Sequence, residues 1–167
     1  MDWPSLPARN LTRAELEAFV NELGDQPDRW RPLVAFSDQQ RHFVSLFRDD
    51  FVDVWVLCWT PANDTGWHDH DISSGAVRVA TGALTESSPR IGGDPATRTV
   101  RAGESFAFGP DHIHRLAGTA ERTVSIHAYS PPLWRLGQYS IDADGVMRRV
   151  SVSYADELRP LDEPVAA

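Results

Sequence analysis

The residues after Asp50 form a series of short segments with the composition of β-strands, and this series limits the possible folds most strongly. The segments are rich in valine, threonine and aromatic residues, and clusters of glycine, proline, asparagine and aspartate separate them. They read FVDVWVLCW, AVRVATGALTE, RTVRAGE, SFAFG, HRLAG and RTVSIHAYS. No helical pattern lies between them, so a sheet with crossover helices is not expected. The series predicts a mainly β body over residues 51–155, closed as a barrel or jelly roll.

The first 50 residues carry helical patterns instead. In NLTRAELEAFVNELGD, Thr12 and Glu15 have the spacing of a capping box, and Gly24 supplies a stop signal. Four apolar residues share one face of this predicted helix: Leu16, Phe19, Val20 and Leu23. A second helix, which would carry His42, is predicted to begin in SDQQRHFVSLF, with Ser37 as its N-cap and Gln40 at the capping-box position.

The length of the chain fits one domain. A chain of 167 residues can bury a real core but has no room for a second lobe. We expect residues 1–50 to form a helical cover and residues 51–155 to form the barrel. Residues 156–167 are acidic and contain two prolines, so we expect a loosely held tail.

The charge and the cysteine content exclude several classes of partner and compartment. A formal net charge of −8 argues against binding to nucleic acid or to an anionic membrane surface. No apolar segment reaches membrane-spanning length, and the amino-terminal MDWPSLPARN lacks the pattern of a signal peptide. The single cysteine, Cys58, lies in the apolar run VWVLCW, which predicts a buried, unreactive thiol. We expect a cytoplasmic protein that acts on small molecules.

Two histidines in the segment GWHDHDISSGAV have the spacing of metal ligands. On a strand, the side chains of His68 and His70 leave the same face, and two imidazoles aimed at one point can hold a metal. A third ligand should come from a later strand, where FGPDHIHRLAG offers His112 and His114. In the arrangement common in the cupin superfamily a glutamate ligand follows the histidine pair, but Gly75 occupies that place here. The expected ligand set is therefore three neutral imidazoles.

Three neutral ligands have a chemical consequence. They leave Fe(II) with its full double positive charge and with open positions on one side. A thiolate can supply the missing negative charge, because binding to a cation deprotonates a thiol, and dioxygen can occupy the next open position. Zinc would bind the same histidines and could activate water instead, so the ligands alone do not identify the metal.

Three motifs make the sequence similar to the bacterial branch of the cysteine dioxygenases, which are cupin iron enzymes that convert a thiol to a sulfinate with dioxygen. The motifs are HDH at 68–70, HRL at 114–116 and, most specifically, VSIHAYSPPL at 124–133. The resemblance implies a cupin-type double-stranded β-helix, a jelly-roll barrel with N-terminal helices. It implies Fe(II) bound by three residues: His68, His70 and His114.

The resemblance further implies a relay in which a tyrosine hydroxyl reaches the substrate and dioxygen while an imidazole orients it. Its members would be Ser125, His127 and Tyr129. The residues themselves support a shared role, because they alternate along one strand and so face one side, while apolar residues face the other. A strand with all its polar members directed at a metal site is not ordinary core.

Two positions depart from the pattern of this family. Mammalian members carry a cysteine, cross-linked to the relay tyrosine, where this chain and bacterial members have glycine, so Gly75 excludes that cross-link. The family's substrate-binding tyrosine-x-arginine pattern aligns with Phe43 and Ser45, so the expected arginine is absent. Either the substrate lacks a carboxylate at that distance, or another arginine replaces the missing one, for which there are three candidates: Arg41, Arg48 and Arg78. We expect substrate contacts from Phe43, Ser45 and Trp67.

The leading function on these grounds is dioxygenation of a thiol by Fe(II), with L-cysteine converted to cysteine sulfinate. One alternative keeps the chemistry and changes the thiol to a mercapto acid or an aminothiol. Another is a non-catalytic metal-binding cupin that serves as a sensor or binding module. The predicted relay favours an enzyme, because a binding site has no need of a positioned hydroxyl beside the metal.

Overall fold

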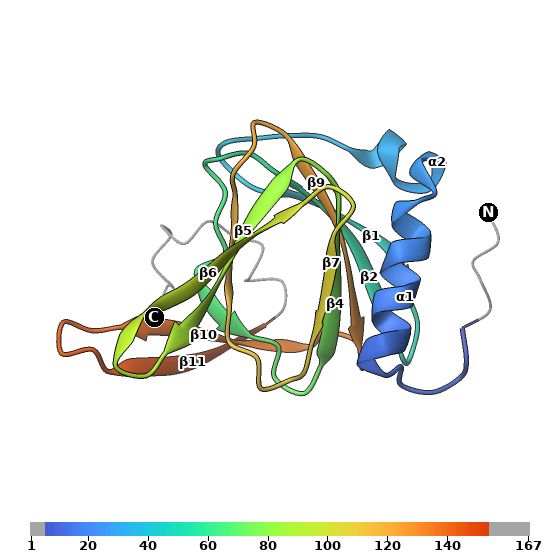
Figure 1. Cartoon of the computed structure of the whole chain (residues 1–167). Coiled ribbons are helices and arrows are strands. Elements are labelled where there is room, and N and C mark those ends of the chain that lie inside the picture. The colour runs from blue at the N-terminus through green and yellow to red at the C-terminus, as the bar shows by residue number, and fades with distance from the viewer. Residues whose placement is uncertain (1–5, 154–167) are drawn as a thin grey trace.

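The structure is a computed structural model that describes residues 6–153. This part of the chain forms three β-sheets and a helical cover (Figure 1). The largest sheet has the strand order β1-β2-β9-β4-β7, and the smaller sheets have the orders β11-β10-β3 and β6-β5-β8. The strands of the large sheet are β1 (His42–Arg48), β2 (Asp53–Trp59), β4 (Ser74–Thr81), β7 (Ser105–Phe108) and β9 (Thr123–Ser130). The other strands are β3 (Trp67–Asp69), β5 (Ala83–Arg90), β6 (Gly93–Arg101), β8 (Arg115–Gly118), β10 (Arg135–Ile141) and β11 (Met147–Ser153).

This architecture confirms the predicted mainly β jelly-roll barrel with an N-terminal helix. All the strand pairs are antiparallel, including the central pairs of β9 with β2 and with β4. The predicted tail at 156–167 lies outside the described residues. None of the helices within residues 6–153 is long and apolar enough to cross a membrane.

Strand β9 lies between the two hydrophobic cores and is buried along its whole length. On one face, Val124, Ile126 and Ala128 join a core that includes the helix. On the other face, Tyr129 joins the core inside the barrel, together with residues of β2, β4 and β7. The alternation predicted for this strand is therefore present, but neither face meets water.

The first helix, α1 (Arg13–Gly24), closes the outer core. It packs on β4, β7 and β9, along one side of the barrel (Figure 1). The capping box is present, because the Thr12 hydroxyl accepts from Glu15 N–H and the Glu15 carboxylate accepts from Thr12 N–H. The buried residues of the helix are the four predicted ones: Leu16, Phe19, Val20 and Leu23.

The prediction of a second helix after Ser37 is wrong, because residues 42–48 form strand β1. The Ser37 hydroxyl does accept hydrogen bonds from the backbone N–H groups of Gln39 and Gln40, at 3.3 and 3.4 Å, but these bonds cap a turn. Strand β1 then pairs with β2, with Phe43 opposite Leu57. Pairing along β2, whose backbone would otherwise be an open sheet edge, outweighs the local helical pattern. The short helices lie earlier, as α2 (Pro27–Trp30) and the 3₁₀ helix η1 (Arg31–Leu33).

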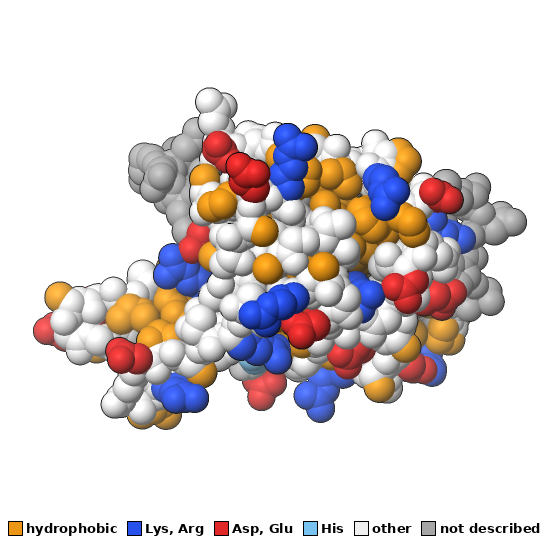
Figure 2. Space-filling view, turned by 45° about the horizontal axis from the view of Figure 1, so that its top comes forward, with side chains coloured by type: hydrophobic (Ala, Val, Ile, Leu, Met, Phe, Trp, Pro, Cys, Tyr) orange, Lys and Arg blue, Asp and Glu red, His pale blue; other side chains and the backbone are white. Residues whose placement is uncertain are grey.

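Cys58 is fully buried in the outer core, as predicted, and burial raises the pKa of its thiol. On the surface, acidic and basic side chains are interspersed over the face that Figure 2 shows.

Candidate metal centre

Three histidines from two neighbouring segments meet inside the barrel. The backbone of His68 pairs directly with that of His114, through N–H to O=C bonds of 2.9 and 3.0 Å in the two directions. His70 follows two residues after His68, so its side chain leaves the same face of the chain. One ring nitrogen from each of the three histidines lies within 4.8 Å of the others, and each side chain is 1% exposed. The structure thus brings the three predicted ligands, at 68, 70 and 114, together at one point.

Hydrogen bonds orient two of the three rings. His68 donates from Nδ1 to the carbonyl oxygen of Gly66 at 3.1 Å, and His114 donates from Nδ1 to the carboxylate of Glu86 at 2.9 Å. Each bond leaves Nε2 as the nitrogen with the lone pair. Within the described residues, Nε2 of His114 and both ring nitrogens of His70 are buried without a hydrogen-bond partner. Buried nitrogens with unshared lone pairs at one point fit a metal ion.

Two of the three histidines, His70 and His114, are in the protonation state that metal binding requires. Burial holds the pKa of His114 at about 3, against the opposing effect of its bond to Glu86. Burial, together with the neighbouring imidazoles, also holds the pKa of His70 well below its usual range. Both rings are therefore neutral at physiological pH, as a metal-binding imidazole must be.

The place of the missing carboxylate ligand is filled by an aromatic ring. Gly75 lies opposite Phe108 on one side and opposite Tyr129 on the other in the large sheet. A Cβ atom at Gly75 would collide with the Phe108 ring, with Cε2 at 2.6 Å. The Phe108 ring in turn packs on His70 and His114, with ring centroids 4.6 and 4.9 Å apart. On the side of the triad where Gly75 and Phe108 lie, the ligands available to a metal are therefore limited to neutral imidazoles.

The three predicted relay residues form a continuous hydrogen-bonded row on the inner face of β9. The hydroxyl of Ser125 lies 2.8 Å from Nε2 of His127, and Nδ1 of His127 lies 3.1 Å from the hydroxyl of Tyr129. All three side chains are buried. The Tyr129 ring stacks on the ring of His70 at 5.2 Å, so the row ends against the histidine triad.

A hydrogen bond from an indole supports one consistent direction for the hydrogen bonds in this row. Trp59 donates from Nε1 to the hydroxyl of Ser125 at 2.8 Å. The Ser125 hydroxyl can then donate to Nε2 of His127, whose Nδ1–H donates to the oxygen of Tyr129. In this arrangement each buried polar atom is used, and Tyr129 keeps its own hydrogen as a donor. Burial holds the pKa of His127 well below its usual range, so the ring is neutral and can both accept and donate.

The three predicted substrate contacts have different surroundings. Phe43 is half-buried against the inner core and lies 5.7 Å from the Trp55 ring. Ser45 is exposed and pairs with Trp55. Trp67 lies on the face of β3 opposite to that of His68, because neighbouring strand residues alternate. The geometry therefore keeps Phe43 at the inner core, leaves Ser45 exposed and turns Trp67 away from the histidines.

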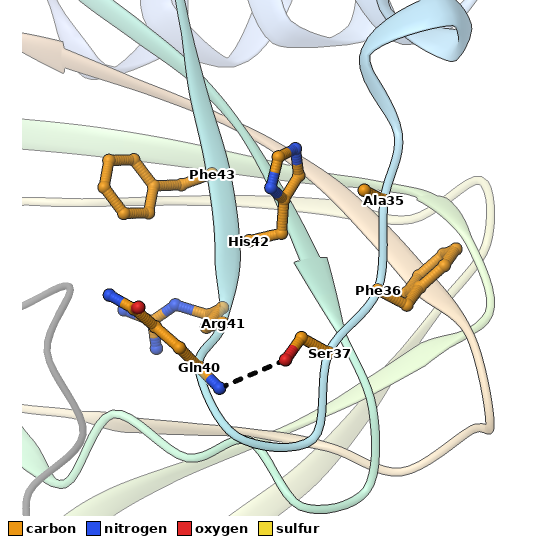
Figure 3. Close-up of a pocket in the computed structure, with 7 residues that line it drawn as sticks. All are labelled: Ala35, Phe36, Ser37, Gln40, Arg41, His42 and Phe43. Carbon is orange, nitrogen blue, oxygen red and sulfur yellow. Dashed lines mark hydrogen bonds between the residues drawn. The ribbon is translucent and has the colours of Figure 1, made fainter.

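Of the three candidate arginines, only Arg41 lies at the inner core. Its guanidinium carbon lies 4.5 Å from the centre of the Trp59 ring, and the side chain is 7% exposed. Residues 35–37 and 40–43 line a cavity of about 290 Å³ (Figure 3). In this segment the side chains of Arg41 and Phe43 point to one side of the chain, and that of His42 points to the other.

The other two arginines are engaged elsewhere. Arg48 forms an ion pair with Asp53 at 2.5 Å and lies over the Trp134 ring. Arg78 pairs with the exposed Asp25 at 3.1 Å and contacts Gly24, on the side of the sheet that faces α1.

The sequence reasoning missed the carboxylate beside the metal centre. Glu86 is 3% exposed, and its carboxylate accepts hydrogen bonds from His114, His112 and Arg98. Burial alone would raise the pKa of Glu86, but these bonds hold it well below its usual range, so the group is ionised. The sequence did contain a signal for the inward position of Glu86. This residue follows the buried Leu84 by two positions on one strand, so the two side chains share a face.

Comparison with known proteins places this site in a family. The sequence model of the family "Cysteine dioxygenase type I" matches residues 8–142. A protein from the zebrafish Danio rerio named "Cysteine dioxygenase type 1" is 25% identical over 131 residues. The alignment covers 71% of this chain and 65% of the zebrafish protein, so this chain spans just under two thirds of that relative.

Solved structures support the fold independently. An uncharacterised protein with a double-stranded β-helix domain from Klebsiella pneumoniae subsp. pneumoniae MGH 78578 has a TM-score of 0.53 at 13% identity, covering 71% of this chain and 91% of that one. A cupin superfamily protein from Desulfitobacterium hafniense DCB-2 also has a TM-score of 0.53, at 12% identity, covering 62% and 89% of the two chains. With a cupin barrel, a buried histidine triad and a family match over most of its length, this chain belongs to the cysteine dioxygenase type I family, whose members are metal-dependent dioxygenases.

Proposed function

We propose that this protein is a thiol dioxygenase that binds Fe(II) through His68, His70 and His114 and oxidises a small thiol, with L-cysteine as the leading substrate. The observation that carries this proposal is the buried contact between the triad and the relay, where Tyr129 stacks on His70. A site that only bound a metal would have no use for a hydroxyl held by two further buried side chains. This argument favours an enzyme over a sensor or binding module.

The overall reaction adds both atoms of one dioxygen molecule to the sulfur of a thiol and yields a sulfinic acid. Bound Fe(II) supplies the dioxygen chemistry that protein side chains lack. Tyr129 donates its hydroxyl hydrogen toward the reacting sulfur and oxygen atoms, and His127 holds that hydroxyl in place from Nδ1. The rings of Phe108 and Tyr129 exclude water from the triad, which limits side reactions.

We further propose that Arg41 receives the carboxylate of the substrate. Arg41 stands two residues before Phe43 on the inner side of the sheet, so it replaces the arginine that the family pattern places at Ser45. Its planar guanidinium can pair with a carboxylate through two parallel hydrogen bonds. Thiols with a carboxylate are therefore the preferred substrates. A mercapto acid is the second candidate, because it carries the same group.

Dioxygen consumption by the iron-loaded protein tests this assignment. L-cysteine, 3-mercaptopropionate and cysteamine are compared in wild type, Arg41→Gln and the control Arg78→Gln. The proposal predicts that Arg41→Gln lowers kcat/KM roughly 10- to 100-fold for the two carboxylates, the effect of a lost charged hydrogen bond, and changes it little for cysteamine. The control should behave like wild type. If Arg41→Gln turned over each of the three thiols as fast as wild type does, the role of Arg41 would be contradicted.

A further inference from the structure

A buried carboxylate connects one histidine of the triad to two basic side chains outside it. One oxygen of Glu86 lies 2.9 Å from Nδ1 of His114 and 3.0 Å from Nε2 of His112. The other oxygen accepts from Nε of Arg98 at 2.6 Å. We propose that Glu86 is a positioning residue, which holds His114 in the tautomer and orientation that aim Nε2 at the metal. This inference rests on the proposed function, since it requires a metal at the triad.

The chemistry of the pair determines the tautomer. A carboxylate that is paired with the Arg98 guanidinium accepts hydrogen bonds and does not donate, so the hydrogen between Glu86 and His114 is on Nδ1 of the imidazole. The lone pair is then on Nε2, the nitrogen that is buried without a partner in the described part of the chain. The same bond stops rotation of the ring. Carboxylates that orient metal-binding histidines in this way contribute strongly to metal affinity.

Strand pairing places Glu86 where it is needed. On one side β5 pairs with β8, which begins directly after His114, and on the other side it pairs with β6, where Glu86 lies opposite Arg98. The Arg98 guanidinium also lies over the Phe106 ring, at 4.7 Å from its centre. The carboxylate is therefore fixed from three directions. A water molecule at the position of this carboxylate would not be held by the strand pairing that fixes Glu86.

A second metal at Glu86, His112 and His114 is the competing interpretation, because these three groups also offer ligand atoms within 4.8 Å of one another. The position of Arg98 argues against it. Both Nε and Nη2 of Arg98 contact the same carboxylate oxygen, at 2.6 and 2.5 Å. This guanidinium neutralises the carboxylate and repels a cation beside it. Metal stoichiometry distinguishes the two interpretations.

The first experiment measures the tautomers of the metal-free protein with long-range ¹H–¹⁵N spectra of ¹⁵N-labelled histidine. His114 should carry its proton on Nδ1 and His112 on Nε2, because each ring donates to Glu86 from that nitrogen. In Glu86→Leu, the His114 signal should shift toward the Nε2–H form. A wild-type His114 with its proton on Nε2 would overturn the inference.

The second experiment measures Co(II) affinity by competition with a chelator, for wild type, Glu86→Gln and the control Glu22→Gln. Glutamine keeps the size of Glu86 without its charge, so this variant should fold, and unfolding curves check that it does. The inference predicts one Co(II) per chain in all three proteins, with affinity lower by about 10- to 100-fold in Glu86→Gln alone. Glu22 is exposed on α1 and should not affect binding.

The outcomes separate the inference from the function on which it rests. Equal affinities of wild type and Glu86→Gln would overturn the positioning role alone. Two Co(II) ions per chain, one of them lost in His112→Ala, would also overturn it, by showing a second metal site. The absence of stoichiometric Co(II) binding in wild type would overturn both this inference and the proposed function.

Discussion

His112 and His114 are two residues apart, but only His114 offers a nitrogen to both His68 and His70. His114→Ala should therefore abolish stoichiometric metal binding, whereas His112→Ala should keep one metal per chain. Metal analysis of the two purified, iron-loaded variants tests this prediction. If His112→Ala loses the metal and His114→Ala retains it, the third ligand is assigned wrongly.

Tyr129 contributes a hydroxyl to the proposed reaction and a ring to the packing around His70. Tyr129→Phe removes the hydroxyl and keeps the ring, so the variant should bind iron normally. Turnover should fall by roughly a hundredfold or more, the contribution of a positioned proton donor. Iron content and initial rates of dioxygen uptake, measured on the same preparation, check the predicted iron binding and the predicted loss of turnover. Wild-type turnover in this variant would remove the relay from the mechanism.

Gly75 allows Phe108 to lie against the triad. Gly75→Ala should lower the free energy of unfolding by about 1–3 kcal/mol, because the added methyl group enters space filled by that ring. Denaturant unfolding measures the change, with Gly93→Ala as the control, since nothing lies within 4 Å of a Cβ at Gly93. Phe108→Leu in the Gly75→Ala background should restore part of the loss. An equal effect of the two alanine variants would show that the contact is unimportant.

At the scale of elements, Asp69 joins strand β3 to the C-terminal hairpin of β10 and β11. Its buried carboxylate accepts from Nε and Nη2 of Arg149 at 2.7 and 2.9 Å, and from the hydroxyl of Tyr139 at 2.5 Å. The neighbours of Asp69 in the chain are His68 and His70. The hairpin therefore holds the strand that carries two members of the triad.

Arg149→Gln should lower the free energy of unfolding by roughly 1–3 kcal/mol, because it leaves a buried charged acceptor with fewer donors. The neighbouring Arg148→Gln is a matched control, since its side chain is 70% exposed and its contact with Asp142 is long, at 3.5 Å. That control should change the stability by less than about 0.5 kcal/mol. Urea unfolding of both variants gives the comparison, and equal midpoints would contradict the role of the Asp69 contact.

Elements were predictable from the sequence where local pattern and tertiary packing agree. Thr12 and Glu15 identified the start of α1, and the alternation in 124–129 identified the two faces of β9. Residues 42–48 were not predictable in this way, because Ser37 gives the same signal for a turn as for a helix. Strand β1 forms since β2 offers it a partner, and that partner comes later in the chain.

At the scale of the whole molecule, the barrel brings together side chains from strands that are far apart in sequence. The histidine triad was predictable because its spacing matches a known motif. The buried position of Arg41 was not, because it depends on contact with Trp59 across β1 and β2. Glu86 was also missed, since its partners come from two other strands, and a lone acidic residue in a strand gives no motif.

Isotope labelling of the product tests whether this protein adds both atoms of dioxygen to the sulfur of a thiol, as proposed. Iron-loaded protein is incubated with L-cysteine or 3-mercaptopropionate under ¹⁸O₂, and the products are analysed by mass spectrometry. We expect a sulfinate in which both added oxygens carry the label, and no such product from His114→Ala. A product limited to disulfide, or a sulfinate whose oxygens come from water, would contradict it.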